Sequence, residues 1–95
     1  MIHIILWVKY LKTININEYD LSMGKLIDIE SKETYNKNHI NGAINIPYES
    51  LLYNRERLLN KNETYYIYCH GGHKSKKAVG ILELYGYNVV QVLLK

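Results

Sequence analysis

The residues most able to do covalent chemistry form one short stretch, Cys-His-Gly-Gly-His-Lys-Ser, from Cys69 to Ser75. Cys69 is the only cysteine in these 95 residues, so no disulfide can form within them and the thiol is free to react. Gly71 and Gly72 permit a tight loop whose backbone N–H groups turn inward and form a nest for an anion. The pattern is typical of a cysteine nucleophile followed by an anion-binding loop.

Positive charge follows this loop directly. A helix is expected over residues 75–85, and its N-terminal partial positive charge points at the loop. Lys74, Lys76 and Lys77 add formal charge nearby. These effects favour a thiolate, which makes Cys69 a better nucleophile. The alternative is an inert, buried cysteine at a strand end, and the cationic, glycine-rich turn favours the reactive interpretation.

Short apolar segments alternate with amphipathic ones along the rest of the chain. Strands are expected at residues 12–15, 25–29, 43–46, 64–69 and 88–94. Helices are expected at residues 31–37, within 48–59 and at 75–85. This alternation predicts a three-layer α/β domain, with a mainly parallel central sheet of about five strands flanked by helices. Ligands bind beyond the carboxyl ends of parallel strands, which is where Cys69 is expected to lie.

Length and charge limit the other functions. Ninety-five residues allow a single domain, expected at residues 12–95. The net charge of +3 is mild and comes from scattered, mixed charges, so nucleic acid is not an expected partner. The chain also has ten tyrosines and no phenylalanine. A buried tyrosine needs a partner for its hydroxyl, so the core is expected to be wet at its margins.

The first eleven residues form an N-terminal apolar segment, 1–11. Its apolar run is too short to cross a membrane, and it lacks the basic start and small-residue cleavage site of a secretory signal. We therefore expect a cytoplasmic protein that does not bind membranes. The segment is expected to pack on the domain as a strand or short helix, or alternatively to form an interface.

Three segments resemble the motifs of single-domain rhodaneses. The stretch from Cys69 to Ser75 is similar to their active-site loop, Cys-x-x-Gly-x-x-Ser/Thr. Asp28, followed by the stretch from His39 to Pro47, resembles their Asp-Val-Arg…Gly-His-Ile-x-Gly-Ala-x-x-x-Pro signature. Residues 84–90 resemble the segment that enters their last strand. Because these motifs occur in the right order and spacing over residues 12–94, the chain is identified as a member of the rhodanese-like family.

The resemblance implies a sulfurtransferase that needs no cofactor. The Cys69 thiolate would attack the outer sulfur of a small anionic donor, thiosulfate or a persulfide, and become a persulfide itself. It would then pass this sulfur to cyanide, to a thiol or to a partner protein. The alternative is a low-turnover rhodanese-fold module that binds a partner or senses sulfide or redox state. A phosphatase is not expected, because the Arg of the Cys-x5-Arg loop is absent and Ser75 stands six positions after Cys69.

The loop residues receive separate roles. Backbone N–H groups are expected to cradle the substrate, and they belong to His70, Gly71, Gly72, His73, Lys74 and Ser75. The side chains of His73 and Lys74 either face the anion or are solvated. Ser75 is expected to cap the following helix rather than to act in catalysis.

Two further residues are expected to support the site. The resemblance implies that Asp28 ties loops together near it, and His39 is expected to fix a turn by hydrogen bonding. No metal site is expected, because a pairing of His39 with His70 or His73 lacks a third ligand.

The chain departs from the family pattern at two places. Glu30 stands where relatives commonly carry Arg, which places an acid near the site. The sequence also lacks the usual C-terminal helix after the last strand. One face of the sheet is then expected to be covered by the N-terminal segment or by a second copy of the chain, that is, by a homodimer.

Overall fold

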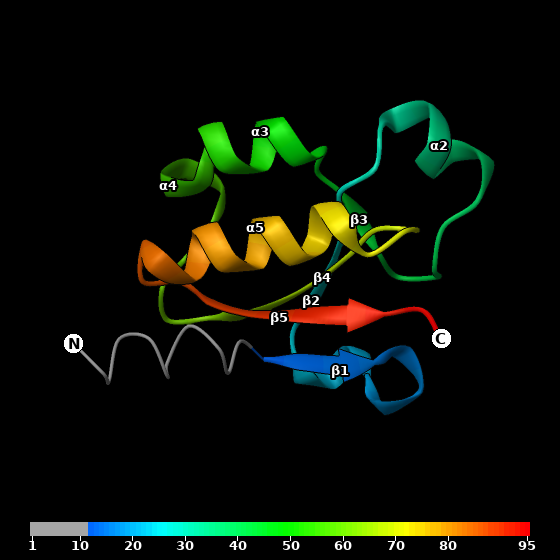
Figure 1. Ribbon diagram of the computed structural model, residues 1–95, viewed down its shortest axis with the longest axis horizontal. Coiled ribbons are helices and arrows are strands. Elements are labelled where there is room, and N and C mark those ends of the chain that lie inside the picture. The colour runs from blue at the N-terminus through cyan, green and yellow to red at the C-terminus, as the bar shows by residue number, and fades with distance from the viewer. Residues whose placement is uncertain (1–11) are drawn as a thin grey trace.

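A five-stranded sheet forms the centre of the computed structural model, which describes residues 12–95. Its strand order is β1-β5-β4-β2-β3, and every pair of neighbours is parallel (Figure 1). The strands are β1 (Thr13–Asn15), β2 (Lys25–Asp28), β3 (Ile44–Asn45), β4 (Thr64–Tyr68) and β5 (Asn88–Leu93). The predicted parallel sheet of about five strands is thus confirmed. The prediction for residues 1–11 lies outside the described residues.

Helices connect the strands and complete the layers. The α-helices described are α2 (Lys32–Lys37), α3 (Tyr48–Tyr53), α4 (Arg55–Leu58) and α5 (His73–Leu84). Two 3-10 helices, η1 (Ile16–Glu18) and η2 (Leu21–Met23), lie between β1 and β2. After β5 the sequence has only Leu94 and Lys95. Among the described residues, none of the helices is long and apolar enough to span a bilayer.

Side chains alternate between the two faces of the sheet, as the pleat of a strand requires. The face toward α3 and α5 carries Ile27, Tyr65, Ile67 and Val89. The opposite face carries Leu26, Tyr66, Tyr68 and Val90, and packs against Ile16 from η1 and Tyr35 from α2. Burying each such aliphatic side chain contributes about 1.5–3 kcal/mol. Cys69 continues the alternation onto the α5 side, which decides where its sulfur points.

Local signals set the ends of the helices. Ser31 caps α2, because its Oγ accepts the Thr34 N–H at 3.2 Å. At the end of α5, Gly86 adopts a left-handed φ of 93°. The Tyr87 N–H then donates to the Leu82 carbonyl at 3.1 Å, which closes a Schellman motif. Ser31 thus starts α2 and Gly86 ends α5, close to the ends expected at residues 31 and 85.

Several tyrosine hydroxyls around the core have protein partners. The Tyr65 hydroxyl accepts the Asn60 N–H at 2.7 Å, and the Tyr35 hydroxyl donates to the Ala43 carbonyl at 2.7 Å. Burial, with help from the neighbouring Asp20, raises the pKa of Tyr19, whose hydroxyl donates to the Gly24 carbonyl. These bonds tie loops to strands at the edges of the core.

One buried polar chain joins three segments on the α2 side of the sheet. Tyr68 donates to the Asp28 carboxyl at 2.8 Å and accepts the Ile40 N–H at 3.0 Å. The other Asp28 oxygen accepts the Glu30 N–H at 2.8 Å. Burial, reinforced by the bond to Asp28, raises the pKa of Tyr68, so the phenol keeps its proton. The end of β2, the end of β4 and the turn after α2 are thereby held together.

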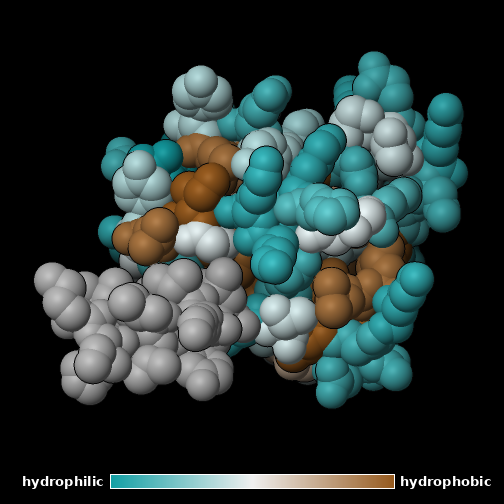
Figure 2. Space-filling model, in the orientation of Figure 1, coloured by the Kyte–Doolittle hydropathy of each residue, from teal (hydrophilic) through white to brown (hydrophobic). Residues whose placement is uncertain are grey.

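Apolar side chains also reach the surface. Figure 2 shows that hydrophilic residues cover much of this face and that hydrophobic ones form separate patches. The large apolar residues with exposed surface are Leu21, Met23, Ile44, Tyr53, Leu84, Tyr85 and Leu93. The expected homodimer stays a prediction, because the structure holds one copy of the chain.

We expect Tyr68→Phe to destabilise the protein by about 1–3 kcal/mol, because it leaves the buried Asp28 Oδ2 and the Ile40 N–H without a partner. Urea unfolding at neutral pH measures the change. Tyr53→Phe is the matched control, since Tyr53 is 87% exposed, and its cost should stay below about 0.5 kcal/mol. Equal costs for the two variants would contradict the structural role of Tyr68.

Candidate functional site

Cys69 lies at the carboxyl edge of the sheet, directly after β4. The preceding carbonyl, of Tyr68, still accepts the Ile29 N–H at 3.1 Å, so the neighbouring strands remain paired up to the cysteine. Only three residues, 70–72, separate Cys69 from the start of α5. Cys69 is 3% exposed and belongs to the core cluster on the α5 side. The loop therefore turns around the sulfur rather than away from it.

The sulfur of Cys69 is surrounded by hydrogen-bonding groups of this loop. Its Sγ accepts the Gly72 N–H at 3.2 Å and the Ser75 N–H at 3.3 Å. The thiol in turn donates to the Ser75 hydroxyl oxygen, which lies 3.4 Å from the sulfur. Two backbone N–H donors and one hydroxyl, which can turn to donate once the thiol has lost its proton, therefore converge on one atom. Such an arrangement stabilises negative charge on the sulfur.

Gly72 makes this turn possible. Its φ of 84° is left-handed, a conformation that glycine adopts without cost and other residues rarely adopt. A Cβ at this position would meet its nearest atoms, on Gln91 and Leu93, at 3.9 Å. Space is thus sufficient, and the backbone conformation is what requires glycine. Gly72 is also the N-cap of α5.

The predicted cap at Ser75 is wrong. The helix begins at His73, two residues earlier than expected, and Ser75 lies in its first turn with a fully buried side chain. The Ser75 hydroxyl donates back to the Gly72 carbonyl at 3.2 Å instead of capping the residues that follow. The left-handed glycine can start the helix early, which the assumption of a side-chain cap did not consider.

Gln91 completes the polar cluster, and the sequence analysis missed it. From β5 its Nε2 donates to the Gly72 carbonyl at 2.9 Å and to the Ser75 hydroxyl at 3.0 Å. The Gly72 carbonyl therefore keeps donors from Gln91 and from the Lys76 N–H even if the Ser75 hydroxyl turns toward the sulfur. A polar residue inside the apolar run Val-Val-Gln-Val was the available signal.

Further amides remain available at the loop. Within residues 12–95, the N–H groups of Gly71, His73 and Lys74 have no hydrogen-bond acceptor. Those of His73 and Lys74 belong to the first turn of the twelve-residue helix α5, where N–H groups have no acceptor inside the helix. The loop and the helix N-terminus thus present donors to an anion beside Cys69.

A hollow of about 250 Å³ opens over the loop. Its lining consists of Cys69, His70, Gly71, Gly72, Leu93, Leu94 and Lys95. The His73 and Lys74 side chains are exposed and are absent from this lining. The charged residue that borders the hollow is Lys95, which the sequence analysis did not name. A small ligand could therefore contact backbone, two leucines and one lysine.

The two supporting residues of the prediction lie at different places. Asp28 is buried, and it is linked to the loop through the neighbouring Glu30, whose side chain accepts the His70 N–H at 2.8 Å. His39 lies after α2, where its Nδ1 is 2.8 Å from the Tyr35 carbonyl oxygen. Its ring stacks on the Tyr35 ring with centroids 3.7 Å apart. The structure thus brings Asp28, but not His39, into hydrogen-bonded connection with the loop.

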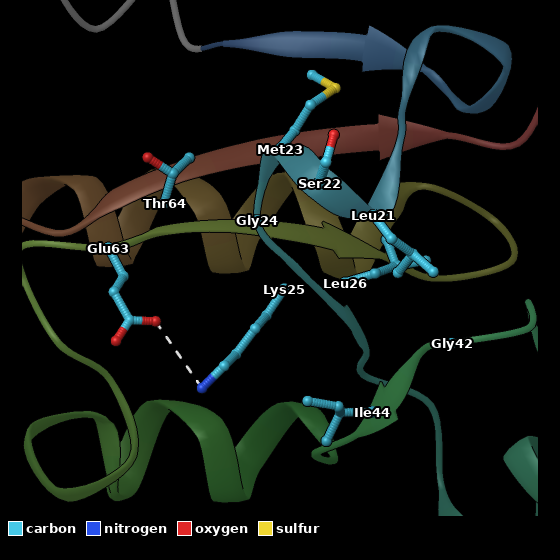
Figure 3. Close-up of a pocket in the computed structure, with 10 residues that line it drawn as sticks. All are labelled: Leu21, Ser22, Met23, Gly24, Lys25, Leu26, Gly42, Ile44, Glu63 and Thr64. Carbon is cyan, nitrogen blue, oxygen red and sulfur yellow. Dashed lines mark ion pairs between the residues drawn. The ribbon is translucent and has the colours of Figure 1, made fainter.

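A second, larger hollow of about 380 Å³ lies at the opposite, amino edge of the sheet (Figure 3). Leu21 and Ile44 border it, and Lys25 Nζ pairs with Glu63 Oε1 at 3.8 Å. Its described lining contains neither Cys nor His. Size alone would favour this hollow, but reactive chemistry favours the smaller one at Cys69. The described residues also contain no group of three or more His, Cys, Asp or Glu side chains that could hold a metal ion.

Comparisons with known proteins agree with this geometry. The family model of the rhodanese-like domain matches residues 9–95, so the chain belongs to the rhodanese-like domain family. The chain is 38% identical over 69 residues to the thiosulfate sulfurtransferase PspE of Escherichia coli. It is 34% identical over 65 residues to the putative sulfur carrier protein YrkF of Bacillus subtilis.

Coverage differs between these relatives. Each match covers 68% of this chain, but only 64% of PspE and 35% of YrkF. The crystal structure of a rhodanese-like domain protein from Staphylococcus aureus is 31% identical, with a TM-score of 0.77. That match covers 87% of this chain and 85% of the other. The predicted fold and family are therefore confirmed.

We expect Gln91→Leu to slow the alkylation of Cys69 by iodoacetamide several-fold at neutral pH. Without Gln91, the Gly72 carbonyl loses one of its donors and holds the Ser75 hydroxyl more strongly, so this hydroxyl is less available to the sulfur. The variant should also lose about 1–3 kcal/mol of stability in urea unfolding.

Asn88→Ala is the control for this experiment. Asn88 lies on the same strand, three residues before Gln91. Its Nδ2 donates to the Lys61 carbonyl at 3.0 Å and makes no contact with the loop at Cys69 among the described hydrogen bonds. Its alkylation rate should match the wild type. If Gln91→Leu also reacts at the wild-type rate, the cluster does not tune the sulfur.

Proposed function

We propose that the protein is a sulfurtransferase that carries sulfane sulfur as a persulfide on Cys69. The observation that supports this most strongly is the convergence of the Gly72 and Ser75 N–H groups on the Cys69 sulfur. These donors stabilise the thiolate that must attack, and they lie beside the N-terminus of α5. Membership of the rhodanese-like family and the similarity to a named thiosulfate sulfurtransferase support the same function.

The first half-reaction loads the cysteine. The Cys69 thiolate attacks the outer sulfur of thiosulfate, and a new S–S bond forms between them. The S–S bond of thiosulfate breaks, and sulfite leaves with its electron pair. Cys69 then carries a terminal sulfur with negative charge. No proton and no external oxidant or reductant is needed for this step.

The second half-reaction unloads it. An acceptor such as cyanide or a thiolate attacks the terminal sulfur, and Cys69 leaves as a thiolate. These 95 residues contain no second cysteine that could resolve the persulfide internally. The acceptor is therefore a group outside these residues, such as a small thiophile or a thiol on a partner protein. The name of the relative YrkF, a putative sulfur carrier, supports a protein partner.

The chain's own groups have separate roles in these steps. The persulfide extends one atom beyond Sγ, into the hollow that Leu93, Leu94 and Lys95 border. The donors available for the terminal sulfur are the amide of Gly71, which lines this hollow, and those of His73 and Lys74 in the adjoining first turn of α5. Leu93 and Leu94, which border the same hollow, limit the access of water to the terminal sulfur. His70, Gly72 and Ser75 complete the loop around the site.

Intact-mass measurement after incubation with thiosulfate tests this function. We expect the wild-type protein to gain the mass of one sulfur atom, to lose it on addition of cyanide, and to form thiocyanate over many turnovers. Cys69→Ser should gain nothing. Ser22→Cys combined with Cys69→Ser is a matched control, since it presents a thiol at the other hollow and should form no stable persulfide.

The outcomes separate the alternatives. A persulfide that forms once but does not turn over with any acceptor favours the low-turnover sensing or binding module. No gain of sulfur from thiosulfate or from an organic persulfide would overturn the proposal.

A further inference from the structure

The Glu30 carboxylate is hydrogen-bonded to the loop that follows the nucleophile. Its Oε2 accepts the N–H of His70, the residue directly after Cys69, at 2.8 Å. The two residues are 40 positions apart in sequence, so this is a tertiary contact. Neither the proposed sulfur transfer nor the support of the loop requires a negative charge at this place.

The backbone of Glu30 is fixed on both sides. Its N–H donates to Asp28 Oδ1 at 2.8 Å, and its carbonyl accepts Asn45 Nδ2 at 2.9 Å. Asn45 Nδ2 also donates to the Asp28 carbonyl at 3.0 Å. The residue is half-buried. Glu30 is thus directed at the loop by strands β2 and β3 and does not hang freely in solvent.

Among the described residues, no cationic side chain lies within 4.0 Å of the Glu30 carboxylate. The ion pair that these residues do form, Lys25 with Glu63, lies at the opposite edge of the sheet. Glu30 also uses one amide of the loop, that of His70, as its own donor. The anion nest therefore has one donor fewer and one negative charge beside it.

We propose that Glu30 is a specificity-determining residue that disfavours the thiosulfate dianion relative to organic persulfides of lower charge. The inference rests on the proposed sulfurtransferase function. Repulsion between a fixed carboxylate and a donor grows with the charge of the donor, so the dianion is affected more than a monoanion or a neutral persulfide. Specificity here arises from repulsion of one donor, not from a new contact with the other.

The favoured reaction balances without further reagents. The Cys69 thiolate attacks the outer sulfur of the persulfide R–S–SH, and a new S–S bond forms. The S–S bond of the donor breaks, and the organic thiolate R–S⁻ leaves with the electron pair. The proton stays on the transferred sulfur until solvent or an acceptor takes it.

The test compares two donors in single-turnover loading of Cys69, followed by intact mass: thiosulfate and a persulfide with an uncharged organic group. Glu30→Gln keeps an oxygen that can accept the His70 N–H but removes the charge. We expect it to load from thiosulfate about 3- to 10-fold faster than the wild type, with little change for the persulfide. Glu30→Arg should shift the ratio further in the same direction.

Glu33→Gln is the matched control. Glu33 is exposed in the first turn of α2, three residues away, and makes no contact with the loop among the described hydrogen bonds. It removes the same formal charge, so a general change in net charge would affect both variants equally. Equal donor ratios for Glu30→Gln, Glu33→Gln and the wild type would overturn the role of Glu30.

A second measurement keeps the two proposals separate. Sulfate, a dianion at neutral pH, should protect Cys69 from iodoacetamide at a several-fold lower concentration in Glu30→Gln than in the wild type. This readout needs no sulfur transfer. If the wild type loads sulfur from neither donor, the proposed function fails, and the protection experiment still supports or overturns the charge effect. Equal protection of both proteins would overturn it.

Discussion

The site depends on one constraint: a buried sulfur at the end of a parallel strand must be surrounded by backbone N–H groups. Cys69 is placed on the α5 side by the alternation of β4, and its Sγ accepts the amides of Gly72 and Ser75. Those amides can reach the sulfur only because Gly72 takes a left-handed conformation. As a result, α5 begins at His73, two residues before the buried Ser75. The conformation of the loop and the start of α5 thus determine the surroundings of the reactive sulfur.

Two polar networks hold this loop from opposite sides of the sheet. On the α5 side, Gln91 fixes Gly72 and Ser75. On the α2 side, Tyr68 joins Asp28 to the turn before β3, and Asp28 in turn positions Glu30 against His70. Buried polar groups are costly unless paired, so both networks specify one arrangement of the loop. β5 thus supports the loop around the nucleophile, while β2 and β3 position the charge beside it.

The sequence predicted the layers, the parallel sheet and the position of Cys69 because these follow from apolar periodicity and from short local motifs. It could not predict Gln91 or the contact of Glu30, since both depend on which strands become neighbours. The expected cap at Ser75 was wrong because a glycine can begin a helix without a side-chain acceptor. For the side chains of His73 and Lys74 the sequence left two alternatives open, facing the anion or solvated. Both side chains are exposed, and neither residue lines the hollow at Cys69.

The central claim is that the loop amides hold the sulfur that Cys69 carries. A crystal structure of the protein after soaking with thiosulfate tests it most directly. We predict density for one additional sulfur on Sγ, within hydrogen-bonding distance of the amides of Gly71, His73 or Lys74, and an otherwise unchanged loop. An unmodified Cys69, or a terminal sulfur that points away from these amides, would contradict the account.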